Sequence, residues 1–229
     1  MPPSVSGMQL SAGAIGDAKG QAAGLSEAFA SLRRFAGSRP PVERCELCGV
    51  ELSLEHQHLL ARESRQIACS CDACAILFCG QEGAKFLRVP RRILRLESFS
   101  FTDLQWEAMM LPIHLAFFVR EPDGKTTAMY PSPAGAMESQ ITLPAWKELF
   151  GSEPLLCTVE LEVEALMVNR IGSEQAYFIA PIDFCYRLVG LIRTKWRGLS
   201  GGAEVWQAIA DFFAELEKRA MHVGEERHA

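Results

Sequence analysis

Two pairs of cysteines carry the clearest chemistry in the chain. Cys45 and Cys48 form one C-x-x-C pair, Cys71 and Cys74 form a second, and residues 49–70 separate them. A C-x-x-C turn places two thiolates on one side of a tight loop, and Gly49 supplies the positive φ that such a turn commonly requires. Two pairs complete a tetrahedron of sulfur atoms about 2.3 Å from a zinc ion. The spacing therefore predicts a four-thiolate Zn²⁺ site, with iron as the alternative metal.

Composition favours metal binding over disulfides. The chain has 229 residues, a formal net charge of −5 and eight cysteines, six of which lie within residues 45–79. The first residues lack the basic end and apolar block of a signal peptide, so we expect a cytoplasmic protein, in which clustered thiols bind metal. No apolar run reaches the ~18–20 residues needed to span a membrane. The acidic balance argues against nucleic acid as a partner, because nucleic-acid binding requires positive charge.

Two histidines and two further cysteines lie close to these pairs. His56 and His58 should project from the same face of a strand. Either one of them is a metal ligand or a base next to the metal, or they have no role at the metal itself. In the second case they form the polar face of a small hairpin, or one imidazole is hydrogen-bonded behind the ligands, and both interpretations are open. Cys69 is a secondary ligand candidate that can replace Cys71. Cys79 is expected to be a small buried residue at the end of a helix.

The elements around the cysteines predict a small zinc module. The second pair runs into Ala75 and the apolar residues 76–78, which indicates a helix that begins near Cys71. Residues 54–60 and 66–69 can form a hairpin around residues 62–65. A knuckle, a hairpin and then a helix that bears the second pair is the treble-clef arrangement. A zinc ribbon is the alternative if the second pair lies on another hairpin.

The remaining chain predicts an α+β fold, in which this treble-clef-like zinc module precedes a mixed α/β body with two C-terminal helices. We expect a mobile tail at 1–20, an amphipathic helix at 21–38, the zinc module at 42–90 and the body at 91–229. In the body, strands are predicted at 115–119, 127–130 and 176–180, a stiff connecting loop at 131–135, and a helix at 142–150. Residues 155–166 alternate as a strand at first and can become helical later. Pro181 is expected at the first position of one terminal helix, and Gly201–Gly202 separates that helix from the last.

Two known metal folds share part of the cysteine pattern. The knuckle C-E-L-C-G followed by paired histidines resembles HNH nucleases, but that family needs an Asn and a further His for its catalytic metal. The only Asn here is Asn169, and no His lies between His58 and His114, so we do not expect a nuclease. CELCG also resembles the first iron knuckle of rubredoxin, which implies a one-electron iron carrier. The second pair, CDACA, lacks the matching Gly.

A longer resemblance covers nearly the whole chain, from about Pro41 to the last helix. It is carried by CELCG, CAILF, YPSPAGAMES (130–139), EALMVNR (164–170), PIDFCYRLVGLIRTKWRGLSGG (181–202) and the following EVWQAIADFF. Together they resemble an uncharacterised bacterial family of unknown function. Members of that family tend to be encoded beside genes of uptake nickel–iron hydrogenases. The resemblance implies an accessory role in hydrogenase assembly, maturation or electron transfer, with a hydrogenase subunit or a maturation factor as the partner.

The sequence contains no nucleophile elbow, P-loop or dinucleotide fingerprint. The favoured hypothesis is therefore a non-enzymatic, zinc-binding accessory protein that acts by protein–protein docking. The alternative from another class is a metal-dependent enzyme, in which His56 or His58 and one open coordination position carry out hydrolysis or metal insertion. A closed four-thiolate site lacks that open position, so the ligand set distinguishes the two hypotheses.

Overall fold

The computed structural model describes residues 42–81, 83–139, 143–144, 146–151, 153–172 and 175–223. The described residues from Glu43 onward belong to one compact unit. The tail expected at 1–20 and the helix expected at 21–38 lie outside the described residues. Within the described ranges, no helix has the length and apolarity needed to cross a bilayer.

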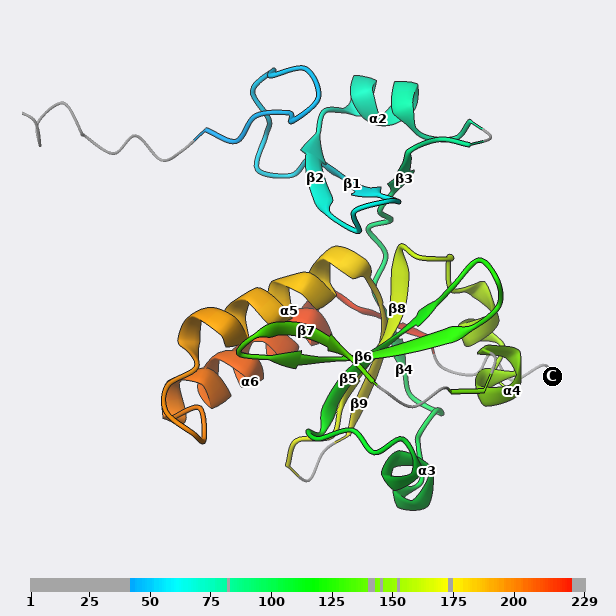
Figure 1. The fold of residues 1–229 in the computed structure, drawn as a ribbon, viewed down its shortest axis with the longest axis vertical. Coiled ribbons are helices and arrows are strands. Elements are labelled where there is room, and N and C mark those ends of the chain that lie inside the picture. The colour runs from blue at the N-terminus through cyan, green and yellow to red at the C-terminus, as the bar shows by residue number, and fades with distance from the viewer. Residues whose placement is uncertain are drawn as a thin grey trace, which may run out of the picture. The chain divides into compact units, whose positions relative to one another are not determined.

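The cysteine-rich segment forms a small sheet and one short helix (Figure 1). Strands β1 (Gln57–Ala61) and β2 (Ile67–Ser70) make the predicted hairpin, and β3 (Phe86–Arg88) pairs with the other edge of β1, so that the order is β2-β1-β3. All of these pairings are antiparallel. Helix α2 (Asp72–Phe78) follows directly after β2, as predicted from the second cysteine pair.

The rest of the described chain is built on a seven-stranded sheet in the order β10-β4-β9-β8-β5-β6-β7. All neighbouring strands are antiparallel except β10 and β4, which are parallel. The strands are β4 (Leu94–Leu96), β5 (Leu115–Arg120), β6 (Thr126–Ser132), β7 (Gly135–Glu138), β8 (Glu164–Asn169), β9 (Ala176–Pro181) and β10 (Met221–Val223). Mixed sheets with helices confirm the α+β class.

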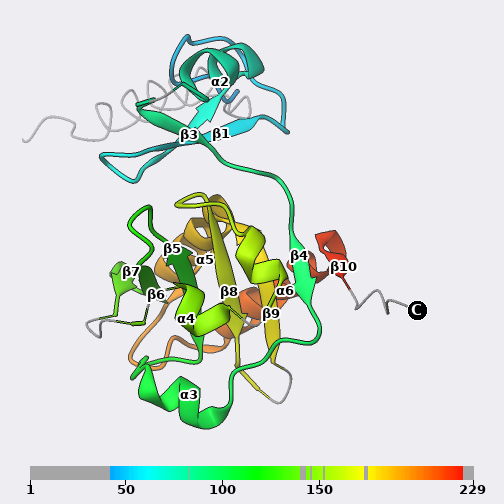
Figure 2. The ribbon, with the colours of Figure 1, turned by 90° about the vertical axis from the view of Figure 1, so that its right-hand side faces the viewer.

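Both faces of this sheet are covered, which explains why β5 reads as an unbroken apolar run. Leu115, Phe117 and Val119 point into a core that is shared with helices α5 (Ile182–Lys195) and α6 (Ala203–Arg219). The alternate residues Ala116 and Phe118 point into a second core on the opposite face. That face is covered by α3 (Asp103–Ala108), α4 (Trp146–Phe150) and the 3₁₀ turn η1 (Leu155–Thr158). Figure 2 shows α4 in front of the sheet, with α5 and α6 behind it.

The two C-terminal helices are confirmed, with one local correction. Pro181 is the N-cap of α5 and the last residue of β9, so the expectation that it occupies the first helical position was wrong by one residue. Gly202, with φ +77°, is the N-cap of α6. The apolar stripe of α6 is buried against the sheet and α5, as expected for a helix that packs on a core.

Two other local predictions differ from the structure. The order expected for residues 155–166 was wrong, because the 3₁₀ turn comes first and β8 begins only at Glu164. Residues 131–135 do join two elements, but the junction is a tight turn rather than a separate loop. Ser132 and Gly135 pair across it, and the Ser132 hydroxyl donates to the Gly135 carbonyl at 2.9 Å.

Candidate metal centre

The first cysteine pair lies in a tight knuckle that local hydrogen bonds hold closed. The Cys45 N–H donates to the Val50 carbonyl at 2.8 Å, and the Gly49 N–H donates to the Cys45 carbonyl at 2.8 Å. Gly49 has φ +77°, which confirms the predicted need for glycine at this position. Cys45 is buried and Cys48 is exposed.

The second pair lies on the first turn of α2. Cys71 is the N-cap of this helix, and its Sγ accepts a hydrogen bond from the Cys74 N–H at 3.4 Å. Residues three apart in a helix share one face. Both sulfurs are therefore presented on the same side of α2, and Cys74 is buried there.

The structure brings the two pairs together. The Sγ atoms of all four cysteines lie within 4.8 Å of one another, and all eight cysteines of the chain are free thiols. Cys48 Sγ and Cys71 Sγ are 3.8 Å apart. Metal–sulfur bonds of about 2.3 Å give a tetrahedron whose sulfur–sulfur edges are about 3.8 Å. The donor set and its spacing therefore fit a metal ion.

The electrostatics of Cys45 and Cys74 agree with a metal site. Burial opposes ionisation of Cys45, but hydrogen bonds from the backbone of Cys71, Leu47 and Cys48 outweigh it and lower the pKa of Cys45 to about 6. Burial and hydrogen bonds to the other thiols raise the pKa of Cys74 to about 12. Ionisation of one thiol is favourable, but its negative charge then opposes ionisation of a second thiol, because like charges repel. A cation between the sulfurs removes that repulsion.

His56, His58 and Cys69, the secondary ligand candidates, form a separate group. One ligand atom from each lies within 4.8 Å of the others. His58 is in β1, His56 just precedes that strand, and Cys69 is opposite His58 on β2. The imidazole rings of the two histidines meet edge to face, with centroids 4.9 Å apart. The structure thus collects these candidates at a second place and does not add them to the four sulfurs.

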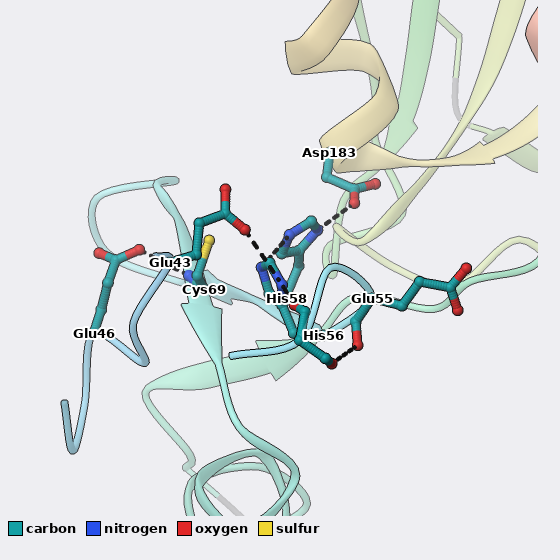
Figure 3. Close-up of polar contacts among 8 residues, drawn as sticks. Glu43, Glu46, Glu55, His56, His58, Cys69 and Asp183 are labelled. Carbon is teal, nitrogen blue, oxygen red and sulfur yellow. Dashed lines mark hydrogen bonds and ion pairs between the residues drawn. The ribbon is translucent and has the colours of Figure 1, made fainter. Parts of the chain in front are cut away.

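Each imidazole is held by a hydrogen bond through Nδ1. His58 Nδ1 lies 2.6 Å from Asp183 Oδ2, and Asp183 is in the first turn of α5 (Figure 3). His56 Nδ1 lies 2.9 Å from the Ser53 carbonyl oxygen and 3.6 Å from Glu43 Oε2. The other ring nitrogens, the two Nε2 atoms, face each other at 3.2 Å.

Two acidic side chains, Glu43 and Glu46, lie near Cys69. Its backbone N–H donates to Glu46 Oε1 at 2.8 Å. Burial, together with the negative charges of Glu43 and Glu46, raises the pKa of the Cys69 thiol. Cys79 was expected to be buried, which was wrong: it caps the C-terminus of the short helix α2 and is half-exposed.

A cavity of about 600 Å³ lies beside the histidine pair. His56, His58 and Asp183 line it together with Arg91, Arg187 and Arg219, among others. Two of these arginines are already paired, because Arg187 and Arg219 both contact Glu215. Small molecules and water can therefore reach the His56 and His58 side chains through this cavity.

A second cavity, of about 750 Å³, lies at the sheet and was not anticipated from the sequence. Its wall includes Tyr130, Trp196, Trp206 and Arg170. The Arg170 side chain is 5% exposed and pairs with Asp103. Its guanidinium also stacks over the Trp106 ring at 5.2 Å.

Asp183 is a residue of the candidate site that could not be found from the sequence. It lies 125 residues after His58, in a helix whose apolar pattern gives no sign of a polar role. The only available signal was an acidic residue in the first turn of a helix, which is common because it favours the helix dipole. Nothing in the sequence connects it with a histidine so far upstream.

Comparison with known proteins places the chain in a family. The model of a family of unknown function, DUF5947, matches residues 44–220, and the chain belongs to this family. The matched range agrees with the resemblance seen from about Pro41 to the last helix. No curated protein and no solved structure matches the chain.

Proposed function

We propose that the chain is a zinc-binding accessory protein, in which the four cysteines hold a structural Zn²⁺ and the function is protein–protein docking. The observation that carries the proposal is the convergence of four free Sγ atoms within 4.8 Å. Four thiolates complete the coordination of Zn²⁺ and leave no open position, which is typical of structural rather than catalytic zinc. The metal then contributes folding free energy to a segment with little core of its own.

The form of the second cysteine pair supports zinc over rubredoxin-like iron. Cys71 and Cys74 lie at the start of helix α2, whereas Cys45 and Cys48 lie in a glycine-containing knuckle. A rubredoxin-like site would use two such knuckles. The treble-clef interpretation is supported by the succession of one knuckle, a hairpin and a helix that carries the second pair.

Exposed apolar side chains on α2 support docking as the mode of action. Ile76 is 73% exposed, Leu77 is 62% exposed and Phe78 is 42% exposed, on three consecutive residues. Apolar groups gathered on a surface are a common mark of a protein-binding site. From the resemblance to proteins encoded beside uptake hydrogenase genes, the proposed partner is a nickel–iron hydrogenase subunit or maturation factor.

The metal assignment is tested with two exposed cysteines. Cys48→Ser removes one of the four sulfurs, and we expect it to lose the structural metal ion because three thiolates no longer close the site. Cys157→Ser is the matched control, since Cys157 is also exposed but belongs to neither cysteine cluster. The measurement is metal content per chain by elemental analysis after purification without added metal. Undiminished metal in Cys48→Ser would contradict the assignment, and a coloured iron protein would favour the electron carrier.

The partner is tested in cells. Deletion of the gene should lower hydrogenase activity while growth on substrates that do not need hydrogenase is unchanged. A tagged chain should co-purify with a hydrogenase subunit or maturation factor, and Leu77→Glu should weaken that association without loss of metal. Normal hydrogenase maturation and turnover in the deletion strain would refute the accessory role.

A further inference from the structure

His56 and His58 each donate a hydrogen bond through Nδ1. The Ser53 carbonyl oxygen can only accept, so the 2.9 Å contact requires the proton on His56 Nδ1. An ionised carboxylate likewise only accepts, so Asp183 requires the proton on His58 Nδ1 at 2.6 Å. Asp183 is itself held in place, because its Oδ1 accepts from the Phe184 N–H at 2.8 Å.

Both Nε2 atoms of the neutral imidazoles therefore carry lone pairs, and the structure points them at each other. They are 3.2 Å apart, with the Cys69 sulfur in the same group. Two lone pairs at this distance repel unless a positive charge lies between them. The charge is either a proton shared by the two rings or a metal ion bound to both.

The arrangement matches a metal site in its ligands and in their support. Nitrogen–metal bonds of about 2.0–2.1 Å and a nitrogen separation near the observed one give an N–M–N angle of about 103°, close to tetrahedral. Metal-bound histidines almost always donate their other ring N–H to a carboxylate or a backbone carbonyl. Here His58 has the carboxylate and His56 has the carbonyl. A proton-sharing pair would not need a thiol at the same place.

We propose that His56 Nε2, His58 Nε2 and Cys69 Sγ bind a second metal ion, distinct from the ion at the four cysteines. Two imidazoles and a thiolate suit a divalent transition-metal cation such as Zn²⁺ or Co²⁺ and do not suit Mg²⁺ or Ca²⁺, which prefer oxygen ligands. Glu43, Glu46 and Asp183 place negative charge around it. The inference goes beyond the proposed function, because a structural ion at four thiolates requires no second ion.

Three protein ligands leave one tetrahedral position open. His56 and His58 line the cavity of about 600 Å³, so a water molecule or a small ligand can reach the open position. This differs from the four-cysteine site, whose coordination the protein completes. The second site therefore has the coordination of an exchangeable or reactive metal, whereas the first has that of a structural one.

The test is the number of metal ions that the full, untagged chain holds. The protein is stripped with a chelator under reducing conditions, reloaded with Zn²⁺ and desalted, and zinc per chain is measured by elemental analysis. We expect two ions in the unmodified protein and one in His58→Gln. His222→Gln is the matched control, because His222 also pairs with a carboxylate, Glu97, but belongs to neither metal-binding group. It should keep two.

Cobalt and a milder substitution keep the proposal testable if His58→Gln folds poorly. At limiting Co²⁺, the spectrum of the unmodified protein minus that of Asp183→Asn should show tetrahedral bands. Their thiolate charge transfer should be weaker than that of the four-cysteine site, because the second ion has one thiolate ligand and the first has four. Asp183→Asn retains the shape of the side chain and should weaken only the second ion, by about 10–100-fold. One ion in the unmodified protein, or two tightly bound ions in both His58→Gln and Asp183→Asn, would overturn the proposal.

Discussion

Arg92, whose side chain is partly exposed, forms an ion pair with the fully buried carboxylate of Glu164, and its removal has a calculable cost. Its Nε donates to Glu164 Oε1 at 2.7 Å and its Nη2 donates to Glu164 Oε2 at 2.7 Å. The Glu164 side chain is fully buried, and its hydrogen bond raises the pKa of Arg92. Arg92 Nη2 also donates to the Thr158 carbonyl at 2.6 Å. Arg92 therefore connects the segment before β4 to the start of β8 and to the turn η1.

Arg92→Met keeps most of the aliphatic stem and removes the charge. After this substitution, the buried Glu164 carboxylate keeps one hydrogen-bond donor among the described residues. That donor is the Glu160 N–H, at 2.9 Å. Loss of one partner of a buried ion pair costs about 3–5 kcal/mol. The remaining N–H bond offsets part of this, so we expect about 3 kcal/mol. With a urea m-value of about 2 kcal/mol/M, the unfolding midpoint should fall by about 1.5 M.

Urea unfolding followed by tryptophan fluorescence measures this effect, because all four tryptophans lie within residues 91–229. Arg91→Met is the matched control: the neighbouring Arg91 is exposed, so its replacement should change stability by less than about 0.5 kcal/mol. Glu164→Gln should cost less than Arg92→Met, because it leaves no unpaired buried charge and Arg92 still reaches water. An Arg92→Met midpoint no lower than that of Arg91→Met would refute the reasoning.

Two glycines should respond in opposite ways to replacement by alanine, measured in the same urea assay. Gly201 has φ +85°, and an added Cβ would lie 2.8 Å from Val205 Cγ1, so Gly201→Ala should cost about 1–3 kcal/mol. Gly190 lies within α5, and an added Cβ would have no heavy atom within 4 Å apart from its chain neighbours and the backbone of its own helix. Gly190→Ala should therefore stabilise the protein by about 0.5–1 kcal/mol. Equal effects of the two substitutions would contradict the requirement for glycine at position 201.

Features that depend on neighbouring residues could be predicted from the sequence. The two C-x-x-C pairs come together in the structure as expected, because a tight turn and the first turn of a helix each position two sulfurs through local geometry. The hairpin β1–β2 and helices α5 and α6 were also found, since alternation and the 3.6-residue period act over short distances. The positive φ of Gly49 could also be predicted, because it depends only on the local geometry of the C-x-x-C turn.

Features that depend on distant contacts could not be predicted. Strands β4 and β10 are three residues long, and each is stabilised by pairing with segments far away in sequence. The order of turn and strand within residues 155–166 could not be predicted, because apolar and polar residues alternate along the whole segment. Packing against distant strands decides that only the part from Glu164 joins the sheet.

The same division applies to the metal-binding residues. The sequence by itself determined that cysteines and histidines capable of binding metal cluster near the start of the described chain. Only the tertiary structure decided that His56, His58 and Cys69 form a group of their own, and that Asp183 orients His58 across 125 residues. The types of the ligands and their short spacings depend only on neighbouring residues. A hydrogen bond between two distant elements forms only after the sheet and helices have packed.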